Sequence, residues 1–317
     1  MHGLDQILHP TDFSEGAASA FVHAVRLARR NDAILHLLNV APDLGEDPIG
    51  GAYGQRVDEQ AYLQELKAET DAEMQQLVDA VDTEGVRIKR VHSRGVAPGP
   101  VITDYAEQED IDLIAVGTTG RRGMRRFVLG SVAEEVVRRA PCSVFTVRSP
   151  HGVEEEPDLI QRLLIPLDLS AYTRPLLRTG YEVAAEYSAA VDLLHVVDAS
   201  PYPKPLVGAF TLRDVVDDPE RRAEGQMDHL IESLAPDAIP TERYVREGHP
   251  ASQIVAAAEE HDVDLIVIAS HGRSGFEGFL VGSVTERVVR RASCPVFVAR
   301  VEPEAPDDQD EASAPEE

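Results

Sequence analysis

The sequence predicts two tandem α/β domains, each a five-stranded, mostly parallel sheet with helices on both faces. Three observations lead to this prediction. Short apolar runs alternate with helical patterns along the chain, and this order is typical of a doubly wound parallel sheet. The second half repeats the first, because Asp12 aligns with Asp168 and Gly130 aligns with Gly282. A chain of 317 residues also has the length of two ordinary domains.

Each element of the first half can be located from its apolar pattern. A strand begins at Ile7–His9, and the segment Ser14–Arg30 places its apolar residues at helical spacing on one face. The strands are almost continuously apolar, which predicts a sheet that is buried on both faces. The other expected elements are, in order, a strand at 33–40, a long helix at 57–81, a strand at 86–92, a helix at 99–109, a strand at 111–117, a helix at 131–139 and a strand at 143–148.

The expected domain boundaries follow from the repeat and from the charge pattern. Domain 1 spans residues 1–150 and domain 2 spans residues 160–301. Three consecutive glutamates within residues 151–159 indicate an acidic linker. The segment 302–317 contains eight acidic residues, three prolines and no basic residue, so we expect a disordered acidic tail.

The charge of the chain is strongly negative. Its formal net charge is −26 at pH 7, and its only lysines are Lys67, Lys89 and Lys204. This balance is typical of a halophilic surface, where high salt screens self-repulsion, although an ordinary acidic protein is the alternative. Sequence-independent binding of DNA or RNA needs a basic face and is not expected. No apolar run approaches the roughly 20 residues that span a bilayer, and the amino-terminal sequence does not resemble a signal peptide, so we expect no membrane association and a cytoplasmic location.

One glycine-spaced segment occurs twice and is the clearest functional signal. It reads GTTGRRGMRRFVLGSV at 117–132 and ASHGRSGFEGFLVGSV at 269–284. Each copy follows an apolar strand and leads into a helix, and ligands of open parallel sheets bind beyond such strand ends. Glycine lets a ligand approach the backbone, and the amino terminus of a helix offers unpaired N–H groups to a phosphate. The pattern therefore predicts a phosphate site in each half.

A purely structural interpretation of the same residues stays open. Ser131 precedes Glu134, and Ser283 precedes Glu286, at the spacing of a capping box, so each serine could simply cap its helix. The glycines could simply form turns. The two interpretations are compatible, because a hydroxyl group at the start of a helix can also turn toward a phosphate.

The two segments match the G-x2-G-x9-G-[ST] signature of the universal stress protein family. The resemblance extends to ILHPTDFS at 7–14, LIPLDLS at 164–170 and PVFV at 295–298, and it covers about residues 3–148 and 160–301. It implies two flavodoxin-like, Rossmann-like domains. Family members with the intact signature bind ATP, so the resemblance implies ATP as the ligand, and we expect Mg²⁺ to bridge its phosphates.

The binding roles of the family transfer residue by residue to the matching positions. The resemblance implies that Asp12 and Asp168 contact the nucleoside and that Val40 and Val196 line the adenine pocket. A carboxylate suits this role because it accepts hydrogen bonds from ribose hydroxyls. The implied phosphate contacts are Gly117, Gly120, Gly130 and Ser131 in the first half, and Gly272, Gly282 and Ser283 in the second half.

The second half departs from the signature at Ala269, which stands where the first half has Gly117. Alanine is costly there if the position needs positive φ, and it is nearly equivalent if the position needs only a small residue. We therefore expect the first site to bind more strongly. We also expect the substitution Ala269→Gly to raise the occupancy of the second site, whereas no change would mean that the position needs only a small residue.

Other charged residues in these segments have roles that stay open. His271 aligns with Thr119, so it is interpreted as a local contact and not as a catalyst. The second copy has Arg273 as its basic residue, whereas the first copy contains four arginines, which could attract a triphosphate or could simply be solvated. These four are Arg121, Arg122, Arg125 and Arg126.

We expect a nucleotide-binding stress or regulatory protein without vigorous catalysis. The sequence contains no GxxxxGK[ST] P-loop, no GxGxxG fingerprint and no GxSxG elbow. Two alternatives stay open. One is a weak ATPase or other nucleotide-processing enzyme, and the other is a protein-interaction scaffold whose glycine loops no longer bind nucleotide.

The last strand of each half is expected to take part in assembly. SVFTVR at 143–148 and PVFVAR at 295–300 are apolar, and an unpaired apolar edge strand is a liability. We expect them to pair with each other as an internal pseudo-dimer, whereas pairing with another chain would give a homodimer or larger assembly. Cys142 and Cys294 stand singly before these strands, which predicts buried packing thiols and not metal ligands.

Overall fold

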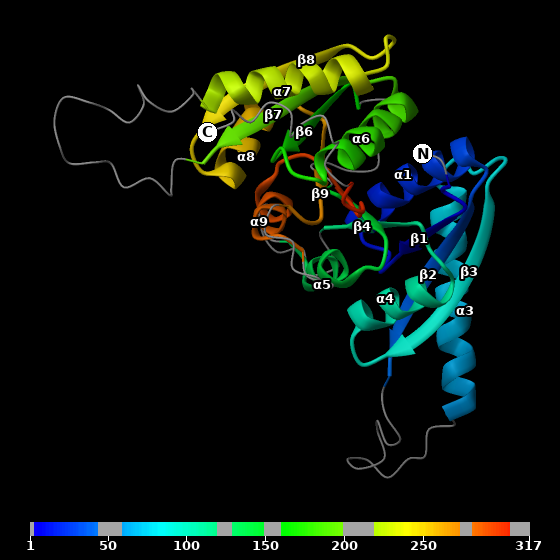
Figure 1. Cartoon of the computed structure of the whole chain (residues 1–317). Coiled ribbons are helices and arrows are strands. Elements are labelled where there is room, and N and C mark those ends of the chain that lie inside the picture. Colours follow the sequence, from blue (N-terminus) through cyan, green and yellow to red (C-terminus); the bar gives the residue numbers. More distant parts are fainter. Residues whose placement is uncertain are drawn as a thin grey trace, which may run out of the picture. The chain divides into compact units, whose positions relative to one another are not determined.

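Figure 1 shows the computed structural model of the chain, which describes residues 3–43, 59–118, 129–148, 160–198, 219–272 and 281–304. The chain divides into two units, Met1–Leu159 and Ile160–Glu317. The linker predicted at 151–159 and the predicted tail from residue 305 onward lie outside the described residues. Within unit 2, the backbone N–H of Glu304 donates to the carbonyl of Ala171 at 3.0 Å.

Unit 1 is a doubly wound, parallel α/β fold. Its five strands stand in the order β3-β2-β1-β4-β5, and every pairing between neighbours is parallel. The elements are β1 (Gln6–Pro10), α1 (Glu15–Asn31), β2 (Ile34–Pro42), α3 (Glu59–Asp79), β3 (Arg87–Gly95), α4 (Pro98–Gln108), β4 (Leu113–Gly117), α5 (Ser131–Arg139) and β5 (Ser143–Val147).

Unit 2 repeats this topology, with the strand order β8-β7-β6-β9-β10 and parallel pairing throughout. Its elements are β6 (Arg162–Leu167), α6 (Thr173–Tyr187), β7 (Ala190–Val197), α7 (Pro219–Leu234), β8 (Thr241–Glu247), α8 (Pro250–Glu260), β9 (Leu265–Ala269), α9 (Ser283–Arg291) and β10 (Val296–Ala299). The prediction of two tandem α/β domains with five-stranded parallel sheets is confirmed.

The direction of the chain explains how helices cover the sheet. From β1, the chain of unit 1 moves through α1 to β2 and then through α3 to β3, whereas α4 and α5 lead in the opposite direction. Right-handed crossovers therefore place α1 and α3 on one face and α4 and α5 on the other. The contacts agree with this, because α4 packs against α5 while α1 packs on β1 and β4.

The central strands form the core, as their continuous apolar runs predict. Ile7 and Leu8 of β1 and Leu113 and Ile114 of β4 have no exposed surface. Strands buried on both faces are mostly apolar, because few of their residues then face water. The same reasoning holds in unit 2, where Leu163 of β6 is also fully buried.

The prediction of continuously apolar strands fails for the edge strand β3. Most of its residues are exposed or half-buried, and several are charged. The Nζ of Lys89 lies 2.5 Å from Oε2 of Glu109, and Nε2 of His92 lies 2.8 Å from Oδ1 of Asp71. Charged side chains on an edge strand discourage unwanted strand pairing, so β3 follows the rule for edges and not the rule for buried strands.

The prediction of buried packing thiols is also only half correct. Neither Cys142 nor Cys294 is part of a disulfide, and each is partly exposed. They lie in the bends that precede β5 and β10, where the chain has not yet entered the sheet.

The backbones of the two units match even at unusual conformations. Positive φ angles at residues other than glycine occur in aligned pairs, after the first strand, at the end of the first helix and after the helix that precedes the fourth strand (α4 in unit 1 and α8 in unit 2). Among the described residues these are Phe13 and Leu169, Asp32 and Ser188, and Asp110 and Asp262. Because such conformations disfavour bulky residues, the pair that follows the first strand points to a constraint beyond packing.

Candidate functional site

The candidate site of each unit lies at the carboxyl edge of its sheet. In unit 1 the strand order reverses between β1 and β4, and in unit 2 it reverses between β6 and β9. Helices leave these two strands toward opposite faces, and in open parallel sheets ligands bind beyond the carboxyl ends of such strands. The predicted site residues Asp12 and Gly117 follow or end β1 and β4, so the topology brings the two motifs to one place.

A strained turn presents the aspartate that follows the first strand. Oδ1 of Asp12 accepts a hydrogen bond from the backbone N–H of Ser14 at 3.1 Å, and the intervening Phe13 has φ 62°. In unit 2, Oδ1 of Asp168 accepts from the N–H of Ser170 at 3.1 Å, and Leu169 has φ 56°. A left-handed conformation costs a bulky residue roughly 1–2 kcal/mol. The same cost at both sites indicates that the turn is needed to orient the carboxylate.

Sequence reasoning identified the aspartates but missed this turn. The signal was present in the repeated Asp-x-Ser spacing, because an aspartate that bonds the N–H two residues later forms an Asx turn. The residues in the middle, Phe13 and Leu169, gave no warning, since both are poor candidates for positive φ.

The second strand of each unit fixes the peptide in front of the aspartate. In unit 1, Nδ2 of Asn39 donates to the carbonyl of Thr11 at 2.9 Å. In unit 2 the aligned residue is His195, whose Nδ1 lies 2.8 Å from the carbonyl of Leu167. A carbonyl only accepts hydrogen bonds, so Nδ1 of this histidine carries a proton. Two different side chains thus perform the same positioning task, and neither was identified from the sequence.

The valines predicted to line the adenine pocket follow directly after these residues. Val40 of β2 and Val196 of β7 are the next residues along their strands, and both are half-buried. Val40 is level with Ser93 of β3 and lies toward the carboxyl end of its strand. The structure therefore places both valines beside the aspartate turns, at the edge where the site was predicted.

Gly117 is required by the packing of the protein itself. It does not have positive φ, which among the described glycines is found at Gly3, Gly85 and Gly248. A Cβ at position 117 would lie 2.8 Å from the backbone nitrogen of Ala17 and still closer to the carbonyl group of Gly16. The first turn of α1 therefore packs directly on this glycine. The position therefore requires a small residue because of close packing, and it does not require a positive φ angle.

The same packing explains why the second half has an alanine. In unit 2, α6 begins at Thr173, and the residue aligned with Gly16 is Tyr172, which precedes the helix as its N-cap. The helix thus starts two residues later in the repeat than α1, which starts at Glu15. Ala269 ends β9 with its side chain buried. The change from glycine to alanine therefore accompanies a change in helix start, and it does not by itself indicate a lost site.

Gly272 brings the two predicted motifs of unit 2 together. A Cβ built at this residue would lie 2.7 Å from Oδ2 of Asp168, a distance that packed atoms do not reach. The backbone of this glycine therefore lies close to the carboxylate, and any larger residue here would require the Asp168 side chain to move. In unit 1 the aligned Gly120 lies outside the described residues, as do Arg121, Arg122, Arg125 and Arg126.

The last glycine of each signature is the N-cap of the next helix. Gly130 has φ −64° and ψ 144°, and Gly282 has φ −61° and ψ 145°. The N–H of Gly130 donates to the carbonyl of Thr118, and the N–H of Gly282 donates to the carbonyl of Ser270, both at 2.8 Å. Each hydrogen bond closes the glycine loop at its base and fixes where the helix begins.

This geometry corrects the capping-box alternative. Ser131 and Ser283 are the first residues of α5 and α9 and are exposed, and neither helix has a side-chain cap. The first intrahelical hydrogen bond in α5 runs from the N–H of Glu134 to the carbonyl of Gly130. Within the described residues, the N–H groups of 131–133 and 283–285 have no acceptor. Such a helix terminus is suited to an anion.

A buried histidine lies below the first site. His9 of β1 has no exposed surface, and its Nδ1 lies 2.9 Å from the carbonyl of Ala115. Burial lowers the pKa of His9 to about 4, although the carboxylate of Asp12 opposes part of this effect. Its Nε2 has no hydrogen-bond partner among the described residues. The imidazole is therefore neutral near pH 7 and contributes no positive charge to the site.

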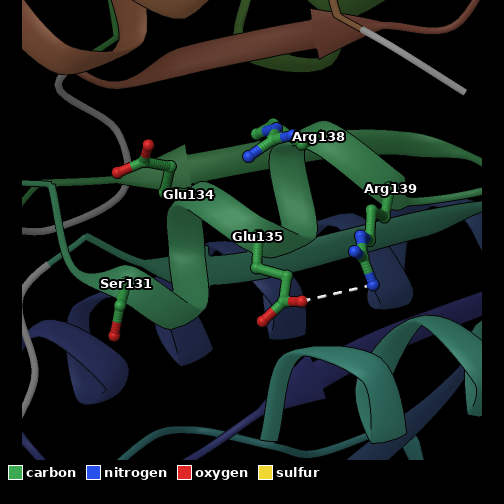
Figure 2. A pocket seen from close by; sticks show the side chains of 5 residues that line it. All are labelled: Ser131, Glu134, Glu135, Arg138 and Arg139. Carbon is green, nitrogen blue, oxygen red and sulfur yellow. Dashed lines mark ion pairs between the residues drawn. The ribbon is translucent and has the colours of Figure 1, made fainter. Parts of the chain in front are cut away.

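A hollow of about 320 Å³ along α5 does not belong to the candidate site. Its lining residues are Ser131, Glu134, Glu135, Arg138 and Arg139. Figure 2 shows Glu135 and Arg139 pointing toward each other, and Oε1 of Glu135 lies 3.4 Å from Nη1 of Arg139. Ser131 is the one lining residue that the signature predicted, and Figure 2 places it at the start of the helix. The hollow is a charged helix surface and lacks the apolar walls of a nucleotide pocket.

The described residues show neither a metal site nor a membrane-spanning helix. Within the described ranges, no group of three or more His, Cys, Asp or Glu side chains has the arrangement of a metal site. None of the described helices is long and apolar enough to cross a membrane.

Comparison with known proteins places both units in one family. The model of the universal stress protein family matches residues 3–148 and 159–300. Universal stress protein MJ0531 of Methanocaldococcus jannaschii is 33% identical over 148 residues, which cover 46% of this chain and 82% of that protein. Universal stress protein Rv2005c of Mycobacterium tuberculosis is 29% identical over 213 residues, which cover 66% of this chain and 69% of that protein.

A solved structure shares the complete fold. The crystal structure of a universal stress protein from Archaeoglobus fulgidus matches with a TM-score of 0.66 and 20% identity, and the match covers 94% of this chain and 98% of that one. The family model covers both units, and the fold agrees across nearly the whole chain. The chain therefore belongs to the universal stress protein family, as a member with two tandem domains.

Proposed function

We propose that this protein is a nucleotide-binding universal stress protein that holds one ATP at the carboxyl edge of each sheet and acts in regulation or stress protection. One observation supports this most directly. In unit 2 the bare backbone of Gly272 meets the carboxylate of Asp168, and the glycine loop closes at Gly282 where α9 begins. This closeness supports a ligand whose nucleoside contacts Asp168 and whose phosphates lie at the start of α9.

In this proposal each part of the nucleotide meets a group of matching chemistry. The carboxylates of Asp12 and Asp168 accept from the ribose hydroxyls. Val40 and Val196 contact the adenine ring. The phosphates lie at the starts of α5 and α9, where backbone N–H groups and the positive end of the helix dipole favour anions. The hydroxyl of Ser131 or Ser283 would be available to a magnesium ion that accompanied the phosphates, and such an ion would offset their negative charge.

The proposal predicts a measurable stoichiometry. Titration calorimetry of the purified protein with MgATP should give two sites per chain. Asp12→Asn and Asp168→Asn should each weaken one site about tenfold, because asparagine keeps the acceptor for the Asx turn and loses the charge that strengthens its bonds to ribose. Each variant is the control for the other, since the unaltered unit must retain its affinity.

The phosphate assignment has its own test. Gly130→Val places a branched side chain at the start of α5 and should weaken the first site. Gly282→Val is the matched variant with less strain, because a Cβ there would lie 3.5 Å from the carbonyl of Ser270, whereas one at Gly130 would lie 3.1 Å from that of Thr118. Unchanged ATP affinity in both variants would show that phosphates do not lie at these helices.

The alternatives predict different outcomes in the same experiments. A slow ATPase or other nucleotide-processing enzyme would release ADP or another product at a rate that the two Asp→Asn variants reduce. A protein-interaction scaffold would show no heat of binding with ATP at either site. ATP bound at two sites without turnover is the result that the proposed function requires.

A further inference from the structure

A held histidine ring stands beside the candidate site of unit 2. The ring of His271 stacks on the ring of Tyr172, with centroids 6.4 Å apart and an interplanar angle of 29°. Its Nδ1 lies 3.0 Å from Oγ of Ser270, which is 7% exposed. A ring that is stacked on one side and hydrogen-bonded at one nitrogen has few orientations available, so its position is defined before any ligand binds.

In the sequence, this ring belongs to the residue next to the proposed phosphate loop. His271 directly precedes Gly272, whose backbone meets the Asp168 carboxylate. The partner ring belongs to Tyr172, the N-cap of α6, and the N–H of Tyr172 donates to Oγ of Ser170 at 3.3 Å. Ser170 in turn belongs to the Asx turn of Asp168. The stacked pair therefore joins the aspartate turn to the glycine loop.

Unit 1 has no counterpart of this arrangement in its sequence. Gly16 stands where unit 2 has Tyr172, and Thr119 stands where unit 2 has His271. The glycine segments also differ in charge. Four arginines lie between Gly120 and Gly130 in the first segment, whereas Arg273 is the one arginine between Gly272 and Gly282 in the second. The glycine segment of unit 2 thus has fewer guanidinium groups than that of unit 1, but it contains the oriented imidazole of His271.

We propose that His271 is a phosphate-contacting residue of the second site, held in place by Tyr172 and Ser270. This inference rests on the proposed nucleotide-binding function. With the Ser270 hydroxyl donating to Nδ1, the proton of the ring is on Nε2, which donates to a phosphate oxygen. Hydrogen bonds to an ionised acceptor are the stronger kind, and a ring that is already oriented loses little entropy on binding. The second site would then select phosphorylated nucleotides through a side chain that the first site lacks.

The experiment compares ATP with adenosine, which lacks phosphate. The starting protein is the full chain with Asp12→Asn, so that calorimetry reports mainly the second site. His271→Ala should lower the affinity for ATP about tenfold, which is the effect of one hydrogen bond to a charged group. The same variant should leave the affinity for adenosine unchanged. Thr119→Ala is the matched control in unit 1 and should not change second-site affinity.

Two further variants separate a phosphate contact from a packing role. His271→Phe keeps a ring that can stack on Tyr172 but has no N–H, so it should lose ATP affinity as the alanine variant does. His271→Gln restores a side-chain N–H and should recover part of it. Full ATP affinity in His271→Phe would overturn the inference, as would equal losses for ATP and adenosine in both variants.

Failure of this inference can be distinguished from failure of the proposed function. If Asp168→Asn weakens ATP binding and no variant of His271 does, the second site exists and the histidine has no part in it. If the unaltered protein binds no ATP, both proposals are wrong. Thermal unfolding of each variant identifies any that fail to fold, and the phenylalanine and glutamine variants then decide in place of alanine.

Discussion

At the scale of single residues, the two halves show how one position can be constrained by packing or by a ligand. Gly117 and Ala269 occupy the same place in the repeat, and the sequence left open whether that place needs positive φ. The structure gives a packing reason, because the backbone of α1 lies against Gly117. Since the constraint comes from Gly16 and not from a nucleotide, we expect Ala269→Gly to leave ATP affinity at the second site unchanged.

The packing explanation predicts a loss of stability in Gly117→Ala. The added methyl group would collide with the Gly16 carbonyl, and relief requires α1 to move from the sheet. Overpacking of this kind costs typically 1–3 kcal/mol, and we expect about 2 kcal/mol in the unfolding of unit 1 by urea. Ala269→Gly is the control and should cost no more than about 1 kcal/mol. Equal stability of Gly117→Ala and the unaltered protein would contradict the close contact.

The buried histidine of β1 predicts a pH dependence. The pKa of His9 is lowered to about 4 in the fold, whereas its ordinary value is 6.5. The unfolded chain therefore binds a proton below about pH 6.5 that the folded chain binds only near pH 4, so stability falls as pH falls through this window. Relative to about pH 8, this one group should remove about 2 kcal/mol by about pH 5.

His9→Ile tests this dependence with a residue that the protein already uses. The aligned position in unit 2 is Ile165, which is fully buried. The variant should gain about 2 kcal/mol relative to the unaltered protein between about pH 8 and about pH 5, measured by urea unfolding at each pH. If the two proteins lose stability equally as the pH falls, the pKa of His9 is the same in the folded and unfolded chains, and the burial argument is wrong.

At the scale of elements, the sequence predicted the central strands and most helices but not the turns between them. Continuous apolar runs such as Leu113–Gly117 have one interpretation, because they must be buried on both faces. The helix at Ser131–Arg139 was predicted with the correct bounds. Its cap was not, because Ser131 with Glu134 matched a capping box while the actual N-cap is Gly130. The spacing of residues does not show where the hydrogen bond to Thr118 fixes the helix start.

Helix α7 contains a glycine that nothing in the fold requires. Gly225 lies in the middle of Pro219–Leu234, is exposed, and has no atom within 4 Å of an added Cβ. Alanine loses less conformational entropy in a helix, so Gly225→Ala should stabilise unit 2 by about 1 kcal/mol. The gain is measured as a higher urea midpoint of the full chain.

A second helical glycine of unit 2 provides the control. Gly180 of α6 is buried, and a Cβ there would come too close to Cδ1 of Ile165. Gly180→Ala should therefore lack the gain, because the core must shift to accept the methyl group. If both alanine variants stabilise equally, space in the core does not distinguish these glycines.

At the scale of the whole molecule, the net negative charge is the feature that most affects how stability depends on salt. The net charge of −26 produces self-repulsion that salt screens, while exposed ion pairs such as Lys89 with Glu109 contribute little. We expect the melting temperature to rise by roughly 5 °C between about 0.1 M and about 2 M KCl, which corresponds to about 2 kcal/mol for a domain of this size. A melting temperature that falls with salt would mean that surface ion pairs outweigh the repulsion, and the halophilic interpretation would be wrong.

The repeat made the site predictable, and the limits of prediction also come from it. Asp12 and Asp168 could be aligned because a strand, an aspartate and a serine recur in the same order. The roles of Asn39 and His195 could not be predicted, because two unlike side chains bind the equivalent backbone carbonyl in the two units. The stacked ring of His271 depends on Tyr172, which lies far away in sequence and is adjacent only in the fold.

Assembly of the two halves is the last prediction from the sequence. Within unit 1, β5 pairs with β4, and within unit 2, β10 pairs with β9, so each strand is the last in the strand order of its own unit. An apolar edge attracts another strand unless something covers it. We expect Ser143–Val147 and Val296–Ala299 to pair with each other in one chain, which makes the protein a monomer with an internal pseudo-two-fold axis.

Val144→Pro tests this pairing because proline removes a donor from the ladder and is tolerated poorly in a paired strand. If the strands pair within the chain, the variant should unfold in two separate steps, whereas the unaltered protein unfolds cooperatively and elutes as a monomer in light-scattering chromatography. Val136→Ala is a control for general destabilisation, because Val136 is a fully buried residue of the neighbouring helix α5. If the unaltered protein is instead a dimer that Val144→Pro converts to monomers, the edge strands pair between chains and the internal pseudo-dimer does not exist.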